Sequence, residues 1–426
     1  MSILIVIVAA VAFFVLIMAS IALHEVGHLV PAKLFGVKVT QYMVGFGKTL
    51  WSTTRGGTEY GIKAIPLGGY VRLVGMYPPG RPGRLKWLNR LADDAREGEA
   101  QDVTPADDGK LFYQKKTWQK LIVMFGGPAM NLLLAFAIFL GINMTYGQHR
   151  PQPVAAVVND CMIPAGRAER TCQPGDPQTP AKQAGILAGD RIVALNGVRY
   201  TDWEALSEAI RANGSGPADF VVERDGAEVA LPRVNTVVTR VADRLDPSKT
   251  IEAGFLGVRP TIARETTGPV GTAKDMWRMT KQSLVALASF PVKVWNVAAD
   301  LVTGQPRDIN GPISIVGASR VAGEVATADR LPLGDRIATW FGLLGSVNLF
   351  VALLNLVPLV PLDGGHMAGA IYEWLKRSAA RLLGRPDPGH ADTAKMLPVV
   401  YVVGGFLLIA GAILILADII TPISIF

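Results

Sequence analysis

Four long apolar runs without charged residues divide the chain into membrane-type and water-exposed segments. They cover Ser2–Leu23, Leu121–Tyr146, Ile337–Leu362 and Met396–Ala417. A helix of roughly 20 residues crosses a hydrocarbon core about 30 Å thick, so each run predicts a membrane-spanning helix. No Lys or Arg precedes Lys33. The first run therefore lacks the basic start of a signal peptide and predicts an uncleaved span.

The segments between the spans carry strand and turn patterns. Residues Trp51–Met76 alternate around Pro66-Leu67-Gly68-Gly69, which predicts a membrane-associated β-hairpin with a glycine-rich turn. Residues 80–110 are rich in charge, Gly and Pro and predict a mobile loop. Residues 153–241 combine short strands, one helix and a hairpin at Asp225-Gly226, which predicts one small α+β domain.

The segment Val270–Val302 repeats apolar positions at helical spacing with scattered Lys and Arg. It predicts either an amphipathic helix at the membrane interface or a helix packed on the small domain. The whole pattern predicts a polytopic α-helical membrane protein with eight segments. These are 1–30, the first span; 31–119, the hairpin and loop; 120–146, the second span; 147–245, the small domain; 246–336, the amphipathic segment; 337–366, the third span; 367–395, a loop; and 396–426, the fourth span and tail.

Composition and charge agree with a membrane location. Half of the 426 residues are hydrophobic and 18% are charged, against about a quarter in soluble domains. The net charge of +7 arises in residues 31–120, which hold 15 Lys and Arg against 8 Asp and Glu. This location indicates a membrane boundary and no nucleic-acid partner. Because basic loops stay in the cytoplasm, residues 31–119 and 367–395 are expected inside, and both termini and the small domain outside the cell membrane.

The first apolar run is followed by His24-Glu25-Val26-Gly27-His28, a His-Glu-x-x-His motif on an expected helix. Residues four apart share one helical face, so His24 and His28 can bind one Zn²⁺. Zinc lowers the pKa of a bound water toward about 7. Glu25 can take the proton from that water and later deliver it to a leaving amine. Ionisable groups at an apolar span are costly and usually functional, so the motif predicts a catalytic zinc site.

A catalytic zinc ion requires a third protein ligand and an open position. Asp363 and His366 directly follow the third span, which is expected to run in the same direction as the first and so to end at the same depth. His149 lies at the opposite face, and His390 stands in a loop without a supporting pattern. Asp363 is the preferred ligand because it stands nearest the span and carboxylates are common third ligands.

Three asparagines lie within the apolar runs. Asn131 follows Gly126-Gly127-Pro128 and is expected to bond across packed helices. Asn348 and Asn355 are seven residues apart and share a helical face. Asn355 stands eight residues before Asp363, and two roles remain open for it, interhelical packing or orientation of substrate or of an oxyanion.

Cys161 and Cys172 are the two cysteines of the chain, and both lie in the segment expected outside. An oxidising compartment permits a structural disulfide between them, and two unpaired thiols are the alternative. Two cysteines are too few for a disulfide scaffold or a cysteine-rich zinc fold. The metal is therefore expected on His and carboxylate side chains.

Taken together, these motifs resemble the site-two protease family of intramembrane zinc metalloproteases, and in layout its bacterial regulator-of-sigma-E protease group. The resemblance covers all four spans and rests on four motifs in order: His24-Glu25-x-x-His28, Ile65-Pro66-Leu67-Gly68-Gly69-Tyr70-Val71, Gly126-Gly127-Pro128-x-x-Asn131 and Leu362-Asp363-Gly364. It implies hydrolysis of peptide bonds within membrane-spanning segments, with two His and one Asp on Zn²⁺ and Glu25 as the base.

The resemblance also implies how substrate is held. The family inserts its β-hairpin into the membrane, which makes Gly68 and Gly69 candidate substrate-binding residues. The outside domain resembles a PDZ domain, with Ala184–Asp190 standing where the family has a Gly-Leu-x-x-Gly-Asp loop, so Gly185 and Asp190 are candidates for binding a terminal carboxylate. There is room for one such domain where many relatives have two, as in actinobacterial members.

The implied partners are membrane lipid and single-pass membrane proteins, such as anti-sigma factors or remnant signal peptides. Two other classes of function compete with a protease. A catalytically silent PDZ-containing scaffold is disfavoured by the intact Glu25 and the three candidate ligands. A metal transporter would need a second cluster of intramembrane His and carboxylates, which the apolar runs do not contain.

Overall fold

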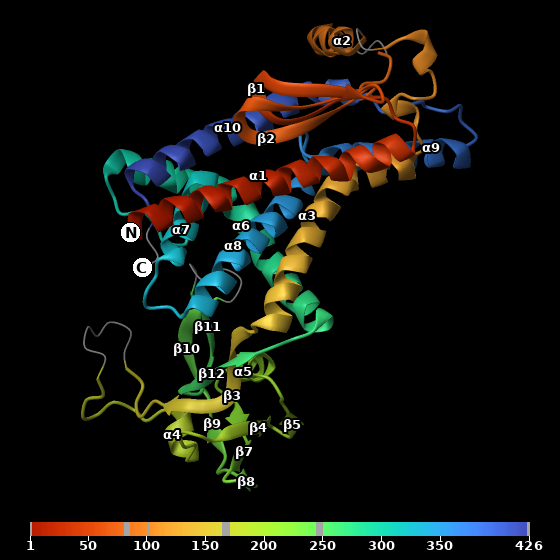
Figure 1. Ribbon diagram of the computed structural model, residues 1–426. Coiled ribbons are helices and arrows are strands. Elements are labelled where there is room, and N and C mark those ends of the chain that lie inside the picture. Colours follow the sequence, from red (N-terminus) through yellow and green to blue (C-terminus); the bar gives the residue numbers. More distant parts are fainter. Residues whose placement is uncertain (1, 81–85, 101–102, 164–170, 244–249, 424–426) are drawn as a thin grey trace. The chain divides into compact units, whose positions relative to one another are not determined.

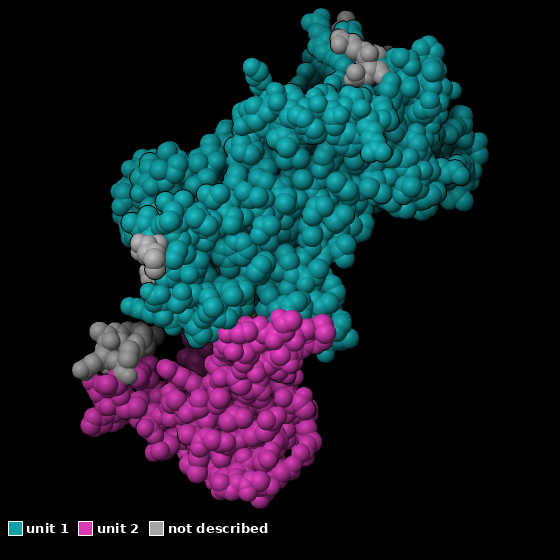
Figure 2. All heavy atoms as spheres, viewed as in Figure 1, with its two compact units in different colours: residues 1–142, 269–426 teal, residues 143–268 magenta. Residues whose placement is uncertain are grey.

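The computed structural model describes residues 2–80, 86–100, 103–163, 171–243 and 250–423. The chain forms two compact units (Figure 2). The first unit comprises residues 1–142 and 269–426, and the second comprises residues 143–268. The small domain is thus an insertion between two parts of the helical unit.

Among the described residues, five helices are long and apolar enough to cross a membrane. They are α1 (Ser2–Leu34), α3 (Thr117–Thr145), α6 (Pro269–Thr303), α8 (Leu333–Asn355) and α10 (Leu397–Ile420) (Figure 1). Four of them coincide with the expected spans, but α8 ends at Asn355 and not at the expected Leu362, because the chain turns between α8 and α9. The fifth, α6, is the segment that the sequence suggested as an interfacial helix or a helix on the small domain.

Helix α6 belongs to the helical unit, so the expectation that it packs on the small domain was wrong. Val294 and Val297 pack against Leu414 of α10, and Met276 lies against the cluster of α3 and α8 that contains Leu349. Its scattered Lys and Arg lowered its apparent hydrophobicity in the sequence, and a long stem allows such side chains to reach the membrane interface. The expected count of four helices therefore omitted a fifth candidate span.

Helices α1 and α3 cross in direct backbone contact at Gly27 and Gly126. A Cβ atom added to either glycine would collide with the carbonyl oxygen of the other. Small residues permit this approach, which improves van der Waals packing between helices in lipid. The crossing fixes α3 against the part of α1 that carries the His-Glu-x-x-His motif.

The predicted β-hairpin exists, but its turn was placed wrongly. Strand β1 covers Val39–Arg55 and β2 covers Thr58–Leu73, so the turn is at Gly56-Gly57, both with positive φ. The stretch Pro66–Gly69 lies inside β2, where Gly68 has φ +124° and bends the strand. A Gly-Gly pair is a turn signal, and this segment contains two such pairs. The first pair, Gly56-Gly57, closes the hairpin, and the second lies within β2.

Because both strands bend, the two form a sheet that is four segments wide. Residues 41–44 pair with residues 59–62 on one side and with residues 69–72 on the other. The end of β1, residues 51–55, pairs with residues 58–62 and forms the outer edge. The segment 69–72 is the opposite edge, and this sheet lies alongside α1 (Figure 1).

Shorter helices complete the helical unit. They are α2 (Lys86–Ala100), α7 (Ile315–Ala326), α9 (Asp363–Leu382) and the 3-10 turns Pro105–Asp107, Phe112–Gln114 and Thr393–Met396. The expectation of a loop over 80–110 was therefore wrong for α2, while 81–85 and 101–102 lie outside the described residues. Helix α7 packs on α1, with Ala322 against Phe13 and Ile17.

The second unit is a small α+β domain, as expected. Its main sheet has the order β12-β3-β4-β7-β8, with β5 beside β4, and two further pairs are β6-β9 and β10-β11. The strands are β3 (Gln148–Val158), β4 (Arg191–Leu195), β5 (Val198–Arg199), β6 (Pro217–Ala218), β7 (Phe220–Arg224), β8 (Ala227–Ala230), β9 (Val234–Asn235), β10 (Val237–Ala242), β11 (Thr250–Phe255) and β12 (Val258–Glu265). The helices α4 (Pro180–Ala184) and α5 (Trp203–Ala212) cover its core.

The domain continues past its expected end at residue 245, which itself lies outside the described residues. Strand β12 pairs along β3, the first strand of the domain, so the unit extends to Gly268. A long-range pairing of this kind has no local sequence signal. A disulfide joins Cys161 and Cys172, one of the two states that the sequence left open.

The loop before β4 is closed by a buried ion pair. Asp190 is 2% exposed and accepts hydrogen bonds from Arg224 Nε and Nη2 at 2.8 and 2.7 Å, and from Leu187 N at 2.8 Å. The Arg224 guanidinium lowers the pKa of Asp190 most strongly; burial opposes it and the Leu187 N–H adds to it. A carboxyl whose folded pKa lies below its unfolded value stabilises the fold above the unfolded pKa and loses that contribution as the pH falls.

We expect Arg224→Met to destabilise the Gly185–Asp190 loop by about 2 kcal/mol, because a buried carboxylate loses its charged partner. Hydrogen–deuterium exchange of this loop in the full-length protein measures the loss. In the unsubstituted protein, protection should hold from neutral pH down to about pH 4 and decline below it. Arg199→Met is the control, because the Arg199–Glu228 pair is exposed and is expected to contribute less than about 1 kcal/mol. Equal protection in the two variants would contradict this role for Arg224.

Candidate metal centre

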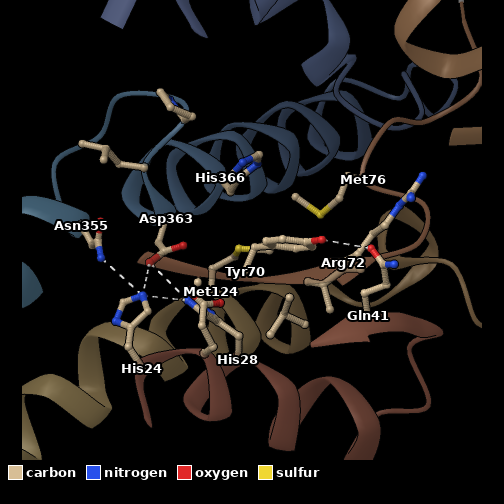
Figure 3. Close-up of a pocket in the computed structure, with 16 residues that line it drawn as sticks. His24, His28, Gln41, Tyr70, Arg72, Met76, Met124, Asn355, Asp363 and His366 are labelled. Atoms are coloured by element: carbon tan, nitrogen blue, oxygen red, sulfur yellow. Dashed lines mark hydrogen bonds and ion pairs between the residues drawn. The ribbon is translucent and has the colours of Figure 1, made fainter. Parts of the chain in front are cut away.

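The two histidines of the motif lie on one face of α1, as the spacing predicted. His24 and His28 are buried, and their Nε2 atoms are 3.2 Å apart (Figure 3). His28 Nδ1 lies 2.8 Å from the Val123 carbonyl oxygen of α3. A carbonyl only accepts, so Nδ1 carries the proton and Nε2 keeps a free lone pair, which is the state a metal ligand needs.

Asp363 reaches the same point from the other end of the chain. It is the first residue of α9, and its Oδ2 lies 3.4 Å from His24 Nε2 and 3.3 Å from His28 Nε2. A Cβ atom on Gly364 would collide with the carbonyl oxygens of Leu356 and Val357. The glycine thus allows the chain to fold back tightly after α8 and to present Asp363 to α1.

The mutual spacing of the three atoms fits a tetrahedral metal ion. Zinc bonds of about 2.0–2.1 Å to nitrogen and oxygen place neighbouring ligand atoms about 3.3–3.4 Å apart. The observed separations are 3.2, 3.3 and 3.4 Å. Buried Asp363 Oδ2 has no hydrogen-bond partner among the described residues. A buried carboxylate oxygen without a donor is costly, and a cation between the three atoms would satisfy it.

Gly127 of α3 forms the wall behind the two histidines. A Cβ atom at this position would collide with Nε2 of both His28 and His24. The sequence indicated Gly126-Gly127-Pro128 only as a packing motif and as part of a family resemblance. In the structure, Gly126 permits the helix crossing, and Gly127 leaves the space in which the three candidate ligand atoms converge.

The three side chains line a cavity of about 580 Å³ that also contains Glu25. Residues Gly69–Leu73, the edge segment of the sheet, form another wall. A Cβ atom on Gly69 would lie 3.1 Å from Glu25 Cγ, so the edge runs close beside the candidate base. Gly68 is not among the described residues that line the cavity, and its Cα hydrogens face the ring of Phe46.

The remaining sequence candidates separate clearly. His366 lines the cavity but is not in the group of three, while His390 Nδ1 lies 3.1 Å from Glu373 Oε1. Asn355 Nδ2 is 3.3 Å from His24 Nε2, so its amide lies at the metal centre. Asn348 donates to Ser20 Oγ at 3.2 Å and to Leu344 O at 2.9 Å, which is a packing role.

The cavity has three further polar residues to which the sequence assigned no role, although Tyr70 stands in the motif Ile65–Val71 that carries the family resemblance. Gln41, Tyr70 and Arg72 line it from the sheet, and Tyr70 OH donates to Gln41 Oε1 at 3.3 Å (Figure 3). Alternation within a strand places Tyr70 and Arg72 on one face, but the direction of that face depends on the bend at Gly68. Gly185 and Asp190 belong to the other unit, and neither takes part in this centre.

Known zinc metalloproteases resemble this chain over almost its whole length. A family model described as Peptidase family M50 matches residues 12–383. The chain is 34% identical to zinc metalloprotease Rip1 of Mycolicibacterium smegmatis, over 98% of this chain and 99% of the relative. It is 33% identical to the protein of that name in Mycobacterium tuberculosis over 98% of each, and 27% identical to metalloprotease MmpA of Caulobacter vibrioides over 85% of each.

The resemblance found in the motifs is therefore confirmed, and the silent-scaffold alternative is not favoured. A zinc cofactor and a multi-pass membrane location follow from the relatives and from the apolar helices. A match to more than half of the chain, together with relatives aligned over almost their whole length, identifies the protein as a zinc metalloprotease that belongs to peptidase family M50.

Proposed function

We propose that His24, His28 and Asp363 hold one Zn²⁺ and that Glu25 is the general base in the cleavage of membrane-spanning substrates. The observation that carries this proposal is the convergence of three buried ligand atoms at 3.2–3.4 Å from two distant parts of the chain. The ion supplies Lewis-acid activation of the attacking water and of the scissile carbonyl.

The residues of the chain divide the proton transfers between them. Glu25 takes a proton from the attacking water while the water oxygen forms a bond to the carbonyl carbon of the substrate. It then delivers this proton to the leaving nitrogen, so the carbon–nitrogen bond breaks to a carboxylic acid and an amine. The Asn355 amide lies at the centre and can donate a hydrogen bond to the carbonyl oxygen as negative charge develops on it.

The sheet edge can supply backbone hydrogen bonds to a substrate that unwinds within the membrane. A helical substrate hides its peptide bonds, and an unwound backbone in lipid loses several kcal/mol for each unpaired group. Residues 69–72 pair with β1 along one side and line the cavity with the other. An extended substrate can therefore add to this edge as a strand, with Gly69 giving close access beside Glu25.

The proposed orientation places α9 and the basic loops in the cytoplasm and the inserted domain outside. The Lys and Arg residues around the start of α3 and after α9 support it. The proposed substrates are single-pass membrane proteins, such as anti-sigma factors or remnant signal peptides, cleaved in regulated intramembrane proteolysis. The sequence resemblance to the regulator-of-sigma-E protease group supports this substrate class.

For the inserted PDZ-like domain we favour a filter over a carboxylate-binding site. Five amides of the Gly185–Asp190 loop already donate within the domain, those of residues 185, 186, 187, 189 and 190. The carboxylate of Asp190 is buried against Arg224. The expectation that Gly185 and Asp190 bind a substrate terminus finds no support in this geometry, because a terminal carboxylate needs free N–H donors.

We expect Glu25→Gln to keep the zinc ion and to abolish cleavage, because an amide cannot accept the proton of the attacking water. The loss should be about 100-fold or more, since the same residue acts as base and as acid. Cleavage of a model transmembrane peptide and metal analysis of the purified protein measure the two effects. Activity above about a tenth of the original with full zinc occupancy would show that another group is the base.

We expect Asp363→Ala to lower zinc occupancy and remove activity, whereas His366→Ala keeps the metal. Asp363 is one of three converging ligand atoms, while His366 only lines the cavity. Both residues lie on the first turn of α9, so the second variant controls for damage to that helix. Metal analysis with the reverse pattern would move the third ligand to His366.

We expect replacement of residues 148–265 by a short Gly-Ser linker to leave zinc bound and to raise cleavage of full-length substrate. Thr267 N donates to Asn143 O at 3.1 Å, so the two ends of the inserted domain are adjacent and a short linker can join them. A filter no longer excludes bulky substrates, and cleavage of a trimmed substrate should persist. If only the cleavage of the trimmed substrate is lost, the filter hypothesis is wrong. The domain would then present substrate to the site by raising its effective concentration.

A further inference from the structure

A second cavity of about 590 Å³ lies between the first turn of α3 and the middle of α9. Its walls combine cationic and apolar side chains. The cations are Lys116, Arg377 and Arg381, and the apolar groups are Trp118, Leu121, Ile371 and Trp374. No residue of the metal centre lines it, so it is a separate site.

Helical spacing explains why these side chains meet. Ile371, Trp374, Arg377 and Arg381 lie three or four residues apart and share one face of α9. On α3, Trp118 and Leu121 are three apart at the end of a candidate span. Both tryptophans are about half exposed, at 51% and 54%, which is typical of rings at a membrane–water boundary.

The apolar wall of the cavity continues along α3. Ile122 and Phe125 follow Trp118 at four and seven residues, on the same helical face, and are 45% and 41% exposed. This face is therefore a strip that starts at the cations and runs into the apolar part of the span. A free inorganic ion makes no favourable contact with such an apolar strip, whereas an acyl chain can pack on it.

The charge of the cavity is also unbalanced. Arg377 bonds to Glu373 Oε1 at 3.3 Å and to Asp387 at 3.0 Å. The Glu373 carboxylate is buried and already accepts from Lys120 and from the Ala391 N–H. Among the described residues, Lys116 and Arg381 form no ion pair within 4.0 Å, and Arg381 acts on Asp387 only through space, so both cations can still bind a ligand.

We propose that this cavity binds an anionic phospholipid of the membrane. The phosphodiester is held by Lys116 and Arg381, with Arg377 beside it, and an acyl chain lies on Trp118 and the apolar strip of α3. Arg and Lys recognise phosphate oxygens by charge-assisted hydrogen bonds, and basic pockets between spans at the membrane surface suit such headgroups.

The experiment is native mass spectrometry of the full-length protein with phosphatidylglycerol or phosphatidylcholine. The unsubstituted protein should retain phosphatidylglycerol in preference. The double variant Lys116→Gln, Arg381→Gln should lower the affinity for phosphatidylglycerol about 30-fold, at about 1 kcal/mol for each basic residue, and leave phosphatidylcholine unchanged. The matched control is the double variant Lys376→Gln, Arg385→Gln. It removes two positive charges as well, one on α9 and one just after it, and neither residue lines the cavity.

A second variant keeps every charge and fills the space. Ser378 lines the cavity, so Ser378→Phe should also reduce phosphatidylglycerol retention. Zinc content of each variant reports an intact fold. An equal loss in the Lys376 and Arg385 control would reduce the effect to general surface charge and overturn the site. Displacement of the lipid by millimolar inorganic phosphate would identify a phosphate-ion site, and equal retention of both lipids would also overturn the proposal.

Discussion

The backbone contact between α1 and α3 is the constraint on which the metal centre depends. Gly27 and Gly126 allow the helices to touch, and Gly127 then lies directly against the Nε2 atoms of the two histidines, the proposed ligand atoms. The same approach brings the Val123 carbonyl to His28 and so selects its proton position. One larger side chain at the crossing would separate the helices, remove this hydrogen bond and displace the ligand atoms. A difference of about 1 Å in ligand position is enough to impair a metal site.

Buried charged side chains near the helix ends form ion pairs with one another. Lys120 and Glu373 pair at 3.2 Å and tie α3 to α9, the helix that begins with Asp363. Asp418 of α10 accepts from Arg307 and, at 2.6 Å, from the Ser314 N–H before α7. Each group would lose several kcal/mol if one partner were removed, because the other charge would stay buried. These pairs position the helices around the centre, where the three proposed ligands remain available to a metal ion.

The sheet contributes geometry that helices alone cannot provide. A helix uses its own backbone hydrogen bonds, whereas the segment 69–72 pairs with β1 on one side and faces the cavity, next to Glu25, with its other side. A membrane protein can keep such an edge only where protein or a cavity surrounds it. Gly68, with φ +124°, bends β2 just before this edge, and it lies against the ring of Phe46. In the proposed mechanism, the edge and Glu25 therefore act on the same stretch of an extended substrate.

The sequence by itself determined the parts of this protein that depend on local periodicity. Apolar length predicted four of the candidate spans, and the four-residue spacing placed His24 and His28 on one face. Equal depth at the ends of two spans indicated Asp363, although it lies 335 residues after His28 (363 − 28) in the chain. Family resemblance added the peptidase class, which the comparisons confirmed.

Tertiary structure decided what depends on pairing between distant segments. The structure has the hairpin turn at Gly56-Gly57 and not at the predicted Pro66–Gly69. The sequence offers two glycine pairs as turn signals, and only the register of the strands decides between them. The small domain gained β12 through its pairing with β3, and α6 joined the helical unit through its packing on α8 and α10. The role of Gly127 and the cavity wall of Gln41, Tyr70 and Arg72 likewise required the crossing of α1 and α3 and the bend of β2, since neither contact has a period that a sequence displays.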